Sequence, residues 1–417
     1  MSKILFMPSW YPTKENPISG CFFKEQAELI SEKNDVIVLH YNIHYVGFLN
    51  FILKTLCKKF ILIKKGDDLR LRDVSLDLYL LKFNKYFNLI IRFLGLKKIK
   101  EKFISSISKR IKKQAFSYLL NFIPKPDLLY GVTAQIIAEK AEEIADFYKI
   151  PYVLSEHSPF PVPGTILSES TKTAIEHSDA FISISNDKTR QILMQNINIH
   201  PYLVGNMIDE DKFQPVHRSG NAHVFTILIV AACNFYKDYE TFLSAMKLLK
   251  KIVSIPFEVN IVGYCPVKDI NMWNLGEAAF IDLVNEYGVM DICHLIPKVD
   301  RKDICNYYND ADVFVMTSIQ EGFPVSSLEA TACGLPVFAT RCGGVEDFID
   351  DKCGRLFNLQ DYKSIAYALK DLIEGRISFD SEYIRNKVIS NYGKQAFLDK
   401  MNKVFEKTIE NYKDKEN

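Results

Sequence analysis

The chain lacks any long apolar run. No uninterrupted stretch approaches the roughly 20 apolar residues that a membrane-spanning helix needs. The apolar start at residues 4–7 is too short for the core of a secretory leader and is followed at once by Pro8. We therefore expect a cytoplasmic protein without a spanning helix.

Cysteine pairs are also missing, although the chain has nine cysteines. They are scattered, with no CxxC pair and no spacing typical of metal ligands. His40 and His44 stand four residues apart, but no further ligand lies near them in the sequence. We expect free thiols in a reducing compartment and no metal site.

Net charge is nearly absent, since 52 basic residues face 51 acidic ones. The overall balance therefore gives no argument for binding nucleic acid. In contrast, 48% of the residues are hydrophobic, and 417 residues exceed what one core usually serves. We expect two domains, each with its own core.

The predicted elements alternate between strand and helix in two rounds. Helices are predicted at 22–31, 134–148 and 239–251 from their apolar periodicity. Short apolar strands are predicted at 4–7, 36–39, 127–130, 152–154, 180–184 and 202–204, and again at 224–231, 257–262, 294–296, 313–316 and 337–340. Such alternation predicts an α/β fold with doubly wound parallel sheets.

We divide the chain accordingly. The first domain is predicted at 1–205, a linker at 206–220, the second domain at 221–393 and a C-terminal helix at 394–417. Pro215 and Gly220 mark the linker, and Phe397, Met401 and Phe405 give the last helix one apolar face.

The most informative segment is 318–344, which reads SIQEGFPVSSLEATACGLPVFATRCGG. The strand 313–316 precedes it, and Pro324 suits the first turn of a helix, where its missing N–H is not needed. The next free N–H groups and the positive helix end form a site for phosphate. Glu321 in the loop and Glu329 in the helix would repel phosphate, so they suit sugar hydroxyls. The pattern predicts a nucleotide-sugar site.

This segment resembles the donor-site signature of the family 4 retaining glycosyltransferases, which have the GT-B fold of two Rossmann-like domains facing across a cleft. The resemblance covers nearly the whole chain and is weakest between about residues 41 and 126. It implies that the C-terminal helix crosses back to the first domain. The matching residues are Glu321, Gly322-Phe323, Glu329, Gly334-Leu335-Pro336-Val337 and Gly343-Gly344, and in the linker Asn206, Asp209, Phe213 and Pro215.

The resemblance also implies residue roles, without a metal ion or other cofactor. Glu321 would face the donor sugar near the reacting centre, and His157 would line the cleft beside it; these two are the candidate catalytic residues. Lys237 would contact the donor phosphates and Glu329 the ribose. The remaining donor-binding candidates are Gly20, Gly263, Gly322, Phe323 and Val325, which would act through the backbone. A solvated lysine and a structurally packed histidine remain the alternatives for Lys237 and His157.

One family feature is missing. The family commonly has an arginine about five residues before Lys237, but residues 231–234 read AACN. An asparagine can donate a hydrogen bond but carries no charge for a diphosphate.

A basic segment interrupts the first domain. Residues 50–113 hold eighteen basic and five acidic residues among many apolar ones, so the rest of the chain is net acidic. Basic and apolar residues together favour an interfacial helix on anionic lipid. The alternatives are ordinary amphipathic helices packed on the domain and, with no supporting motif, nucleic acid.

The resemblance implies a retaining, metal-independent glycosyltransferase of the hexosyltransferase type. It would move a sugar from a nucleotide donor, a UDP-sugar by resemblance, to a glycan or lipid-linked acceptor in cell-surface polysaccharide synthesis. Its place would be the inner face of the plasma membrane. Two alternatives stay open, namely a catalytically silent sugar- or nucleotide-binding subunit and a UDP-sugar epimerase of the same fold.

Overall fold

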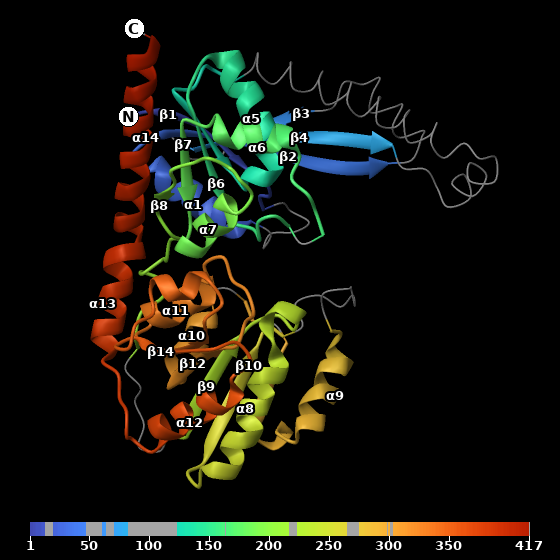
Figure 1. The fold of residues 1–417 in the computed structure, drawn as a ribbon, viewed down its shortest axis with the longest axis vertical. Coiled ribbons are helices and arrows are strands. Elements are labelled where there is room, and N and C mark those ends of the chain that lie inside the picture. The colour runs from blue at the N-terminus through green and yellow to red at the C-terminus, as the bar shows by residue number, and fades with distance from the viewer. Residues whose placement is uncertain are drawn as a thin grey trace, which may run out of the picture.

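The computed structural model describes residues 1–12, 20–46, 61–63, 71–81, 123–162, 164–216, 223–264, 275–297, 299–300 and 303–416. Figure 1 shows two α/β halves, each built around one sheet, with the last helix running along the side of the first half. None of the helices in these ranges combines the length and hydropathy that crossing a bilayer requires.

The first sheet has eight strands in the order β3-β4-β2-β1-β5-β6-β7-β8. All neighbouring pairs are parallel except β3 and β4, which are antiparallel. The central strands are buried on both faces, so their sequences read as continuous apolar runs. The strands are β1 (Lys3–Pro8), β2 (Asp35–Val46), β3 (Ile61–Ile63), β4 (Leu71–Leu81), β5 (Leu128–Val132), β6 (Tyr152–Glu156), β7 (Ala180–Ser183) and β8 (Tyr202–Leu203). Its helices are α1 (Cys21–Ser31), α5 (Ala134–Tyr148), α6 (Glu169–Glu176) and α7 (Asn186–Leu193).

The basic segment 50–113 departs from the helical interpretation where the structure describes it. Ile61–Ile63 and Leu71–Leu81 are strands that extend the sheet beyond β2. The missed signal was the alternation of apolar and polar residues along β4, which is typical of a strand. The remaining parts of the segment, including 82–113, lie outside the described residues.

The second sheet has six parallel strands in the order β11-β10-β9-β12-β13-β14. β14 was not predicted, because its four residues carry little apolar character beyond Leu356 and Phe357. The strands are β9 (Phe225–Val230), β10 (Phe257–Val262), β11 (Cys293–Ile296), β12 (Val313–Met316), β13 (Val337–Thr340) and β14 (Gly354–Phe357). The helices are α8 (Tyr239–Ile252), α9 (Glu277–Tyr287), α10 (Ile304–Asp310), α11 (Val325–Ala332), α12 (Tyr362–Ile373), α13 (Ser381–Tyr392) and α14 (Lys394–Glu416), with short 3-10 turns η1 (Phe235–Lys237), η2 (Met290–Ile292) and η3 (Gly344–Asp347).

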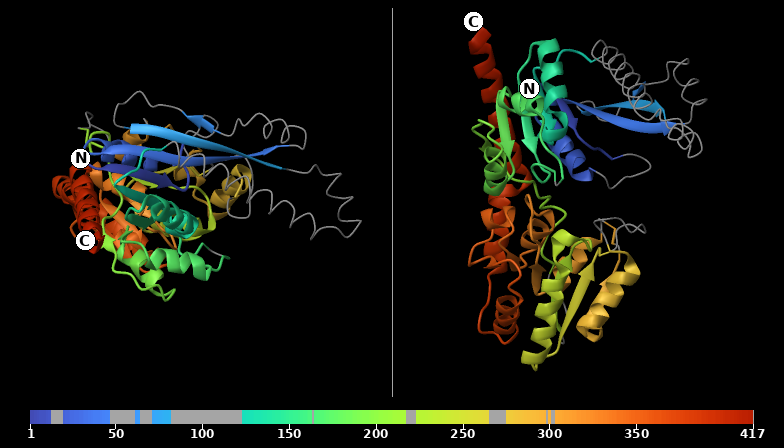
Figure 2. Two further views of the ribbon diagram at one scale, coloured as in Figure 1. Left: turned by 90° about the horizontal axis from the view of Figure 1, so that it is seen from above. Right: turned by 45° about the vertical axis from the view of Figure 1, so that its right-hand side comes forward.

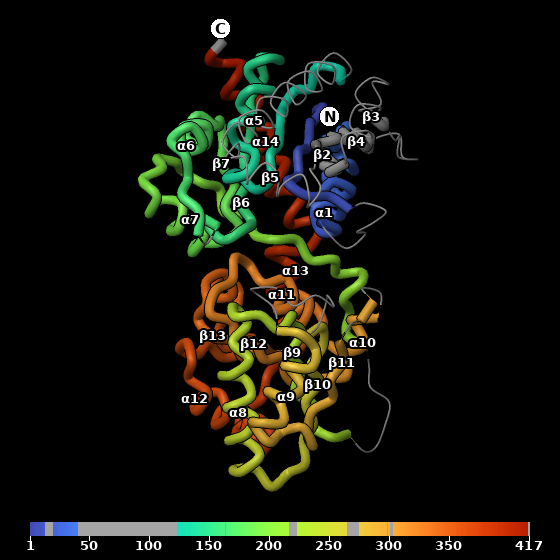
Figure 3. Tube along the Cα trace, turned by 90° about the vertical axis from the view of Figure 1, so that its right-hand side faces the viewer, coloured from blue at the N-terminus to red at the C-terminus, as the bar shows by residue number. Residues whose placement is uncertain are grey.

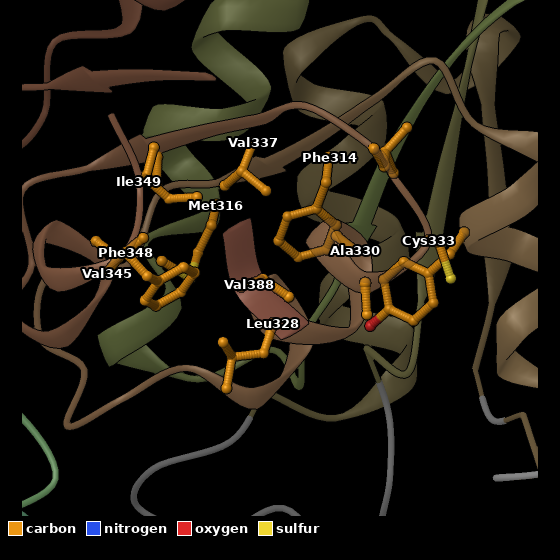
Figure 4. Close-up of a cluster of buried hydrophobic side chains, with 14 of the residues drawn as sticks. Phe314, Met316, Leu328, Ala330, Cys333, Val337, Val345, Phe348, Ile349 and Val388 are labelled. Carbon is orange, nitrogen blue, oxygen red and sulfur yellow. The ribbon is translucent and has the colours of Figure 1, made fainter. Parts of the chain in front are cut away.

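The two faces of the second sheet carry separate cores. Along β12, Val313 and Val315 join one core, while Phe314 and Met316 join the other. Figure 4 shows the second of these, where Phe314 and Met316 meet Leu328 of α11 and Val388 of α13. Burying side chains of this size stabilises by about 1.5–3 kcal/mol each. This packing fixes the helix that follows the 318–324 loop.

The last helix, α14, returns to the first sheet. Phe397, Met401 and Phe405 are buried in a core that also holds Phe6 and Tyr130 of the first domain. The Tyr130 and Phe405 ring centroids lie 5.4 Å apart. Both views in Figure 2 show α14 beside the first domain. The chain therefore connects the two halves twice, through the segment after β8 and through α13 and α14.

Candidate functional site

The carboxyl ends of strands from both sheets meet at the junction of the halves. Figure 3 shows α1 and α7 on the first side of this junction and α11 on the second. A Cβ atom placed on Gly322 would lie 3.3 Å from the His157 carbonyl oxygen and 3.2 Å from Ile184 Cδ1. Ligands bind at the carboxyl ends of parallel strands, so the predicted residues Gly322 and His157 meet where a ligand is expected.

Several hydrogen bonds hold the junction together. Asn206 Nδ2 donates to the Phe323 carbonyl oxygen at 3.0 Å. At the start of α7, the Asn186 backbone N–H donates to Asp347 Oδ2 at 2.8 Å, and its side-chain amide donates to Asp347 Oδ1 at 3.0 Å. These bonds hold the 318–324 loop and η3 against the first domain.

Lys237 and Glu321 come together although 84 residues separate them. Lys237 lies in η1 after β9, and its Nζ is 2.5 Å from Glu321 Oε1. Ser318 Oγ donates to the same oxygen at 2.7 Å. The Glu321 backbone N–H donates to the Cys342 carbonyl oxygen at 2.7 Å, which fixes the residue from its other side. A partly exposed ion pair is thus presented at the end of the sheet.

The helix α11 begins at Val325, and Pro324 is the residue just before it rather than its first residue. No side chain caps this helix, and the first N–H groups of a helix have no partner within it. The ring of Phe323 packs on Phe348 and Tyr392, with centroids 5.1 Å from each. The ring of Phe323 is thus engaged within the chain, and the use of backbone groups at Phe323 and Val325 for ligand binding stays a prediction.

Glu329 lies one turn further along α11 and is 8% exposed. Its Oε2 accepts a hydrogen bond from the Tyr308 hydroxyl at 2.8 Å. Tyr308 comes from α10 and was not singled out by sequence, because a tyrosine in this short helix carries no motif. The hydroxyl helps to orient this carboxylate.

The glycine pair at 343 and 344 makes room for the loop. Gly343 has a φ of 121°, and a Cβ on it would lie 2.5 Å from the Glu321 carbonyl oxygen. A Cβ on Gly344 would lie 2.1 Å from the Gly322 carbonyl oxygen. Backbone cannot yield at such distances, so both positions require glycine.

We expect Gly344→Ala to destabilise the protein by more than the 1–3 kcal/mol typical of an overpacked core. The added methyl group would push the Gly322 carbonyl, and Glu321 with it, away from Lys237. A urea denaturation curve measures the loss. Gly288→Ala is a stringent control, since Gly288 has a positive φ that alanine disfavours but no atom within 4 Å of a built Cβ. An effect no larger than in this control would contradict the close approach.

The other predicted glycines behave differently. Gly20 precedes α1 with a φ of 71°, and a Cβ there would lie 2.6 Å from the Trp10 carbonyl oxygen. Its glycine is thus required by contact within the chain. Gly263 follows β10 with a φ of 79° and has open space around a built Cβ. Backbone conformation alone explains glycine there.

His157 follows β6 and sits edge-on to the rings of Phe22 and Phe23, with centroids 5.3 and 5.2 Å away. Its Nε2 lies 3.2 Å from Ser155 Oγ. Burial and, to a lesser extent, the positive charge of Lys188 lower the pKa of His157 to about 3. The imidazole is therefore neutral at physiological pH.

Sequence reasoning missed two buried charges beside His157. Lys188 of α7 is 1% exposed, and its Nζ donates to the Ser158 carbonyl oxygen and, at 2.9 Å, to Gln191 Oε1. Burial lowers the pKa of Lys188 to about 8 and raises that of Glu156 to about 7. A charged residue at the end of an apolar strand or the start of a helix was the available signal.

Asn234 shapes the turn after β9, the region where the family commonly has an arginine. Asn234 Oδ1 accepts from the Tyr236 backbone N–H at 3.0 Å and so caps η1. Cys233 is buried. Lys237 is thus the cation that this turn contributes at the junction.

Comparisons with known proteins show similarity to glycosyltransferases. A family model described as glycosyl transferases group 1 matches residues 210–396. D-inositol 3-phosphate glycosyltransferase of Paenarthrobacter aurescens is 33% identical over 153 residues, which is 36% of each chain. The enzyme of the same name from an Arthrobacter species is 26% identical over 255 residues, 55% of this chain and 59% of that one. These alignments thus span less than two thirds of either relative.

Solved structures match over the full length. Sucrose-phosphate synthase of Thermosynechococcus elongatus superposes with a TM-score of 0.68 at 17% identity, over 98% of this chain and 99% of that one. An Escherichia coli chain bound with UDP-2-fluoro glucose gives a TM-score of 0.70 at 12% identity, with the same coverage. Anabaena HepE in complex with UDP and glucose gives 0.64 at 13% identity, over 98% and 100%. The chain therefore has the GT-B fold, and its residues 210–396 match the model of the glycosyl transferases group 1 family.

Proposed function

We propose that the protein is a retaining glycosyltransferase that transfers a sugar from a nucleoside diphosphate sugar, a UDP-sugar, to a glycan or lipid-linked acceptor. The observation that carries this proposal is the Lys237–Glu321 pair beside the uncapped start of α11, opposite His157 across the junction. Related folds have been solved with UDP and with UDP-2-fluoro glucose, which supports this donor class.

The geometry suits departure of a nucleoside diphosphate without a metal ion. The ammonium of Lys237 and the N–H groups at the start of α11 would stabilise the negative charge that develops on the leaving phosphate. Glu321 would exchange its bond with Lys237 for the hydroxyls of the donor sugar. Glu329, held by Tyr308, would bind the ribose.

Ligand-induced thermal stabilisation tests the proposal. We would measure the melting temperature with a panel of nucleoside diphosphates and then their sugars, without added metal. A ligand at 100 times its Kd stabilises by about 2.7 kcal/mol. A shift with one base, followed by sugar transfer from that donor with retained anomeric configuration, would establish the function.

The missing arginine favours one second candidate, a nucleotide- or sugar-binding subunit without turnover. A nucleotide-binding subunit would show the thermal shift but neither transfer nor hydrolysis of any donor. The absence of a shift with every nucleotide and nucleotide sugar would contradict the transferase and favour a subunit that binds a sugar alone.

We further propose that the protein works at the cytoplasmic face of the plasma membrane in polysaccharide synthesis. The basic and apolar character of residues 50–113 is the support, since each lysine near an anionic surface contributes about 1 kcal/mol. A lipid-linked acceptor would then lie within reach of the first domain.

Replacing four lysines by glutamine should weaken binding to vesicles that contain phosphatidylglycerol. Cosedimentation measures the loss, which should shrink as salt rises because the attraction is electrostatic. The substituted residues are Lys97, Lys98, Lys100 and Lys102. The control variant replaces the exposed lysines Lys247, Lys251, Lys363 and Lys403. Equal binding by both variants would favour a segment packed on its own domain.

A further inference from the structure

A line of buried polar groups lies behind His157. The Tyr130 hydroxyl on β5 is 3.0 Å from Ser155 Oγ on β6, and Ser155 Oγ is 3.2 Å from His157 Nε2. Tyr130 is 1% exposed and Ser155 is fully buried. The hydroxyl protons of Tyr130 and Ser155 must therefore be donated to other protein atoms.

The available donors and acceptors determine which group donates in each of these two hydrogen bonds. Among the described residues, Ser155 is the only hydrogen-bond partner of the Tyr130 hydroxyl. If Tyr130 accepted from Ser155, its own proton would be buried without an acceptor, which costs about 1–3 kcal/mol. Burial raises the pKa of Tyr130, so the phenol keeps that proton. Tyr130 thus donates to Ser155, and Ser155 donates to His157 Nε2.

The other ring nitrogen of His157, Nδ1, carries the proton in this arrangement. A neutral histidine that accepts at Nε2 carries its proton on Nδ1. His157 Nδ1 and Asn206 Oδ1 are both enclosed and lack a hydrogen-bond partner among the described residues. Asn206 lies close enough for its side chain to oppose the lowering of the His157 pKa. Because Asn206 Nδ2 donates to the Phe323 carbonyl, its Oδ1 is the atom left to receive the Nδ1 proton.

We propose that Tyr130 and Ser155 are positioning residues that hold His157 as the neutral Nδ1–H tautomer, with this proton directed to Asn206 and through it to the 318–324 loop. The line then runs from the core of the first domain to the loop that carries Glu321. In this arrangement Nε2 accepts from Ser155 and Nδ1 carries a proton, so His157 has no lone pair left with which to act as a general base. The effect on turnover rests on the proposed function, whereas the tautomer does not.

The experiment is nitrogen NMR of the full chain labelled with ¹⁵N in histidine, in which the two tautomers give distinct imidazole signals. His157→Gln assigns the signal. We expect the wild-type protein to show a proton on Nδ1 that does not titrate between pH 6 and pH 8. In Ser155→Ala and Tyr130→Phe the signal should move toward a mixture of the two tautomers. The kcat of each variant should fall about tenfold, which corresponds to the free energy of one or two hydrogen bonds.

Tyr152→Phe is the matched control. Tyr152 is a buried tyrosine on β6 whose hydroxyl donates to the Ala174 carbonyl oxygen at 2.7 Å, away from His157. It should leave the His157 signal unchanged. A wild-type proton on Nε2, or a signal unaffected by Ser155→Ala, would overturn the proposal. The wild-type spectrum by itself tests the tautomer of His157, so the proposal can be rejected even if a variant fails to fold. An Nδ1–H signal in a protein without transferase activity would refute the proposed function and leave this inference standing.

Discussion

Glu321→Gln should lower turnover about a hundredfold or more while leaving the fold intact. Glutamine keeps the shape of the side chain but removes the charge that pairs with Lys237. It also weakens the acceptor available to the donor sugar, and loss of one preorganised electrostatic contact in an active site costs about 10²–10³ in kcat. The measurement is kcat under saturating donor and acceptor.

The fold should survive because backbone bonds hold this residue. The Glu321 N–H donates to Cys342, and the Gly344 N–H donates to the Glu321 carbonyl oxygen at 3.3 Å. The melting temperature should therefore stay close to that of the wild type. Glu240→Gln, on the exposed first turn of α8, is the charge-matched control and should keep full turnover. Near-normal turnover of Glu321→Gln would remove the catalytic assignment.

Glu329→Ala should abolish the thermal stabilisation that a nucleotide gives to the wild-type protein. The carboxylate is nearly enclosed in α11, and its Oε2 is held by the Tyr308 hydroxyl. Two ribose hydroxyls bonded to this carboxylate would contribute about 1.5–3 kcal/mol each, so their loss weakens binding at least a hundredfold. Each variant is compared with its own ligand-free melting temperature, since the substitution also changes baseline stability.

Tyr308→Phe distinguishes how much the orientation of the Glu329 carboxylate contributes to nucleotide binding from how much its charge contributes. It removes the hydroxyl that holds Glu329 but keeps the carboxylate, so the nucleotide shift should shrink without vanishing. Glu382→Ala, at an exposed position of α13, should leave the shift unchanged. A full shift in Glu329→Ala would show that the nucleotide binds elsewhere.

Three strands of the second sheet were predictable from sequence because they are short segments rich in buried apolar residues. Residues 313–316 and 337–340 are buried throughout, residues 257–262 are buried at four of six positions, and the structure confirms all three as β10, β12 and β13 with the same bounds. Local composition is sufficient for such strands, because burial acts on most of their residues. The two-domain α/β fold followed from their alternation with helices.

Strands outside the centre of a sheet were harder to predict. β4 alternates charged with apolar residues, and β14 has four residues with Gly354 and Arg355 among them. Such segments become strands through pairing with β2 and β13, which their own sequences do not specify.

Sequence alone identified polar residues in the segments that follow strands, including Glu321, Glu329, His157 and Lys237. Which of these residues touch one another depends on the tertiary structure. Lys237 pairs with Glu321 across 84 residues, and Asn206 reaches Phe323 across 117. Tyr130, Ser155 and Lys188 gained their significance in the same way. The physical reason is that burial is encoded locally along the chain, whereas contacts between side chains depend on strand order and on how two domains meet.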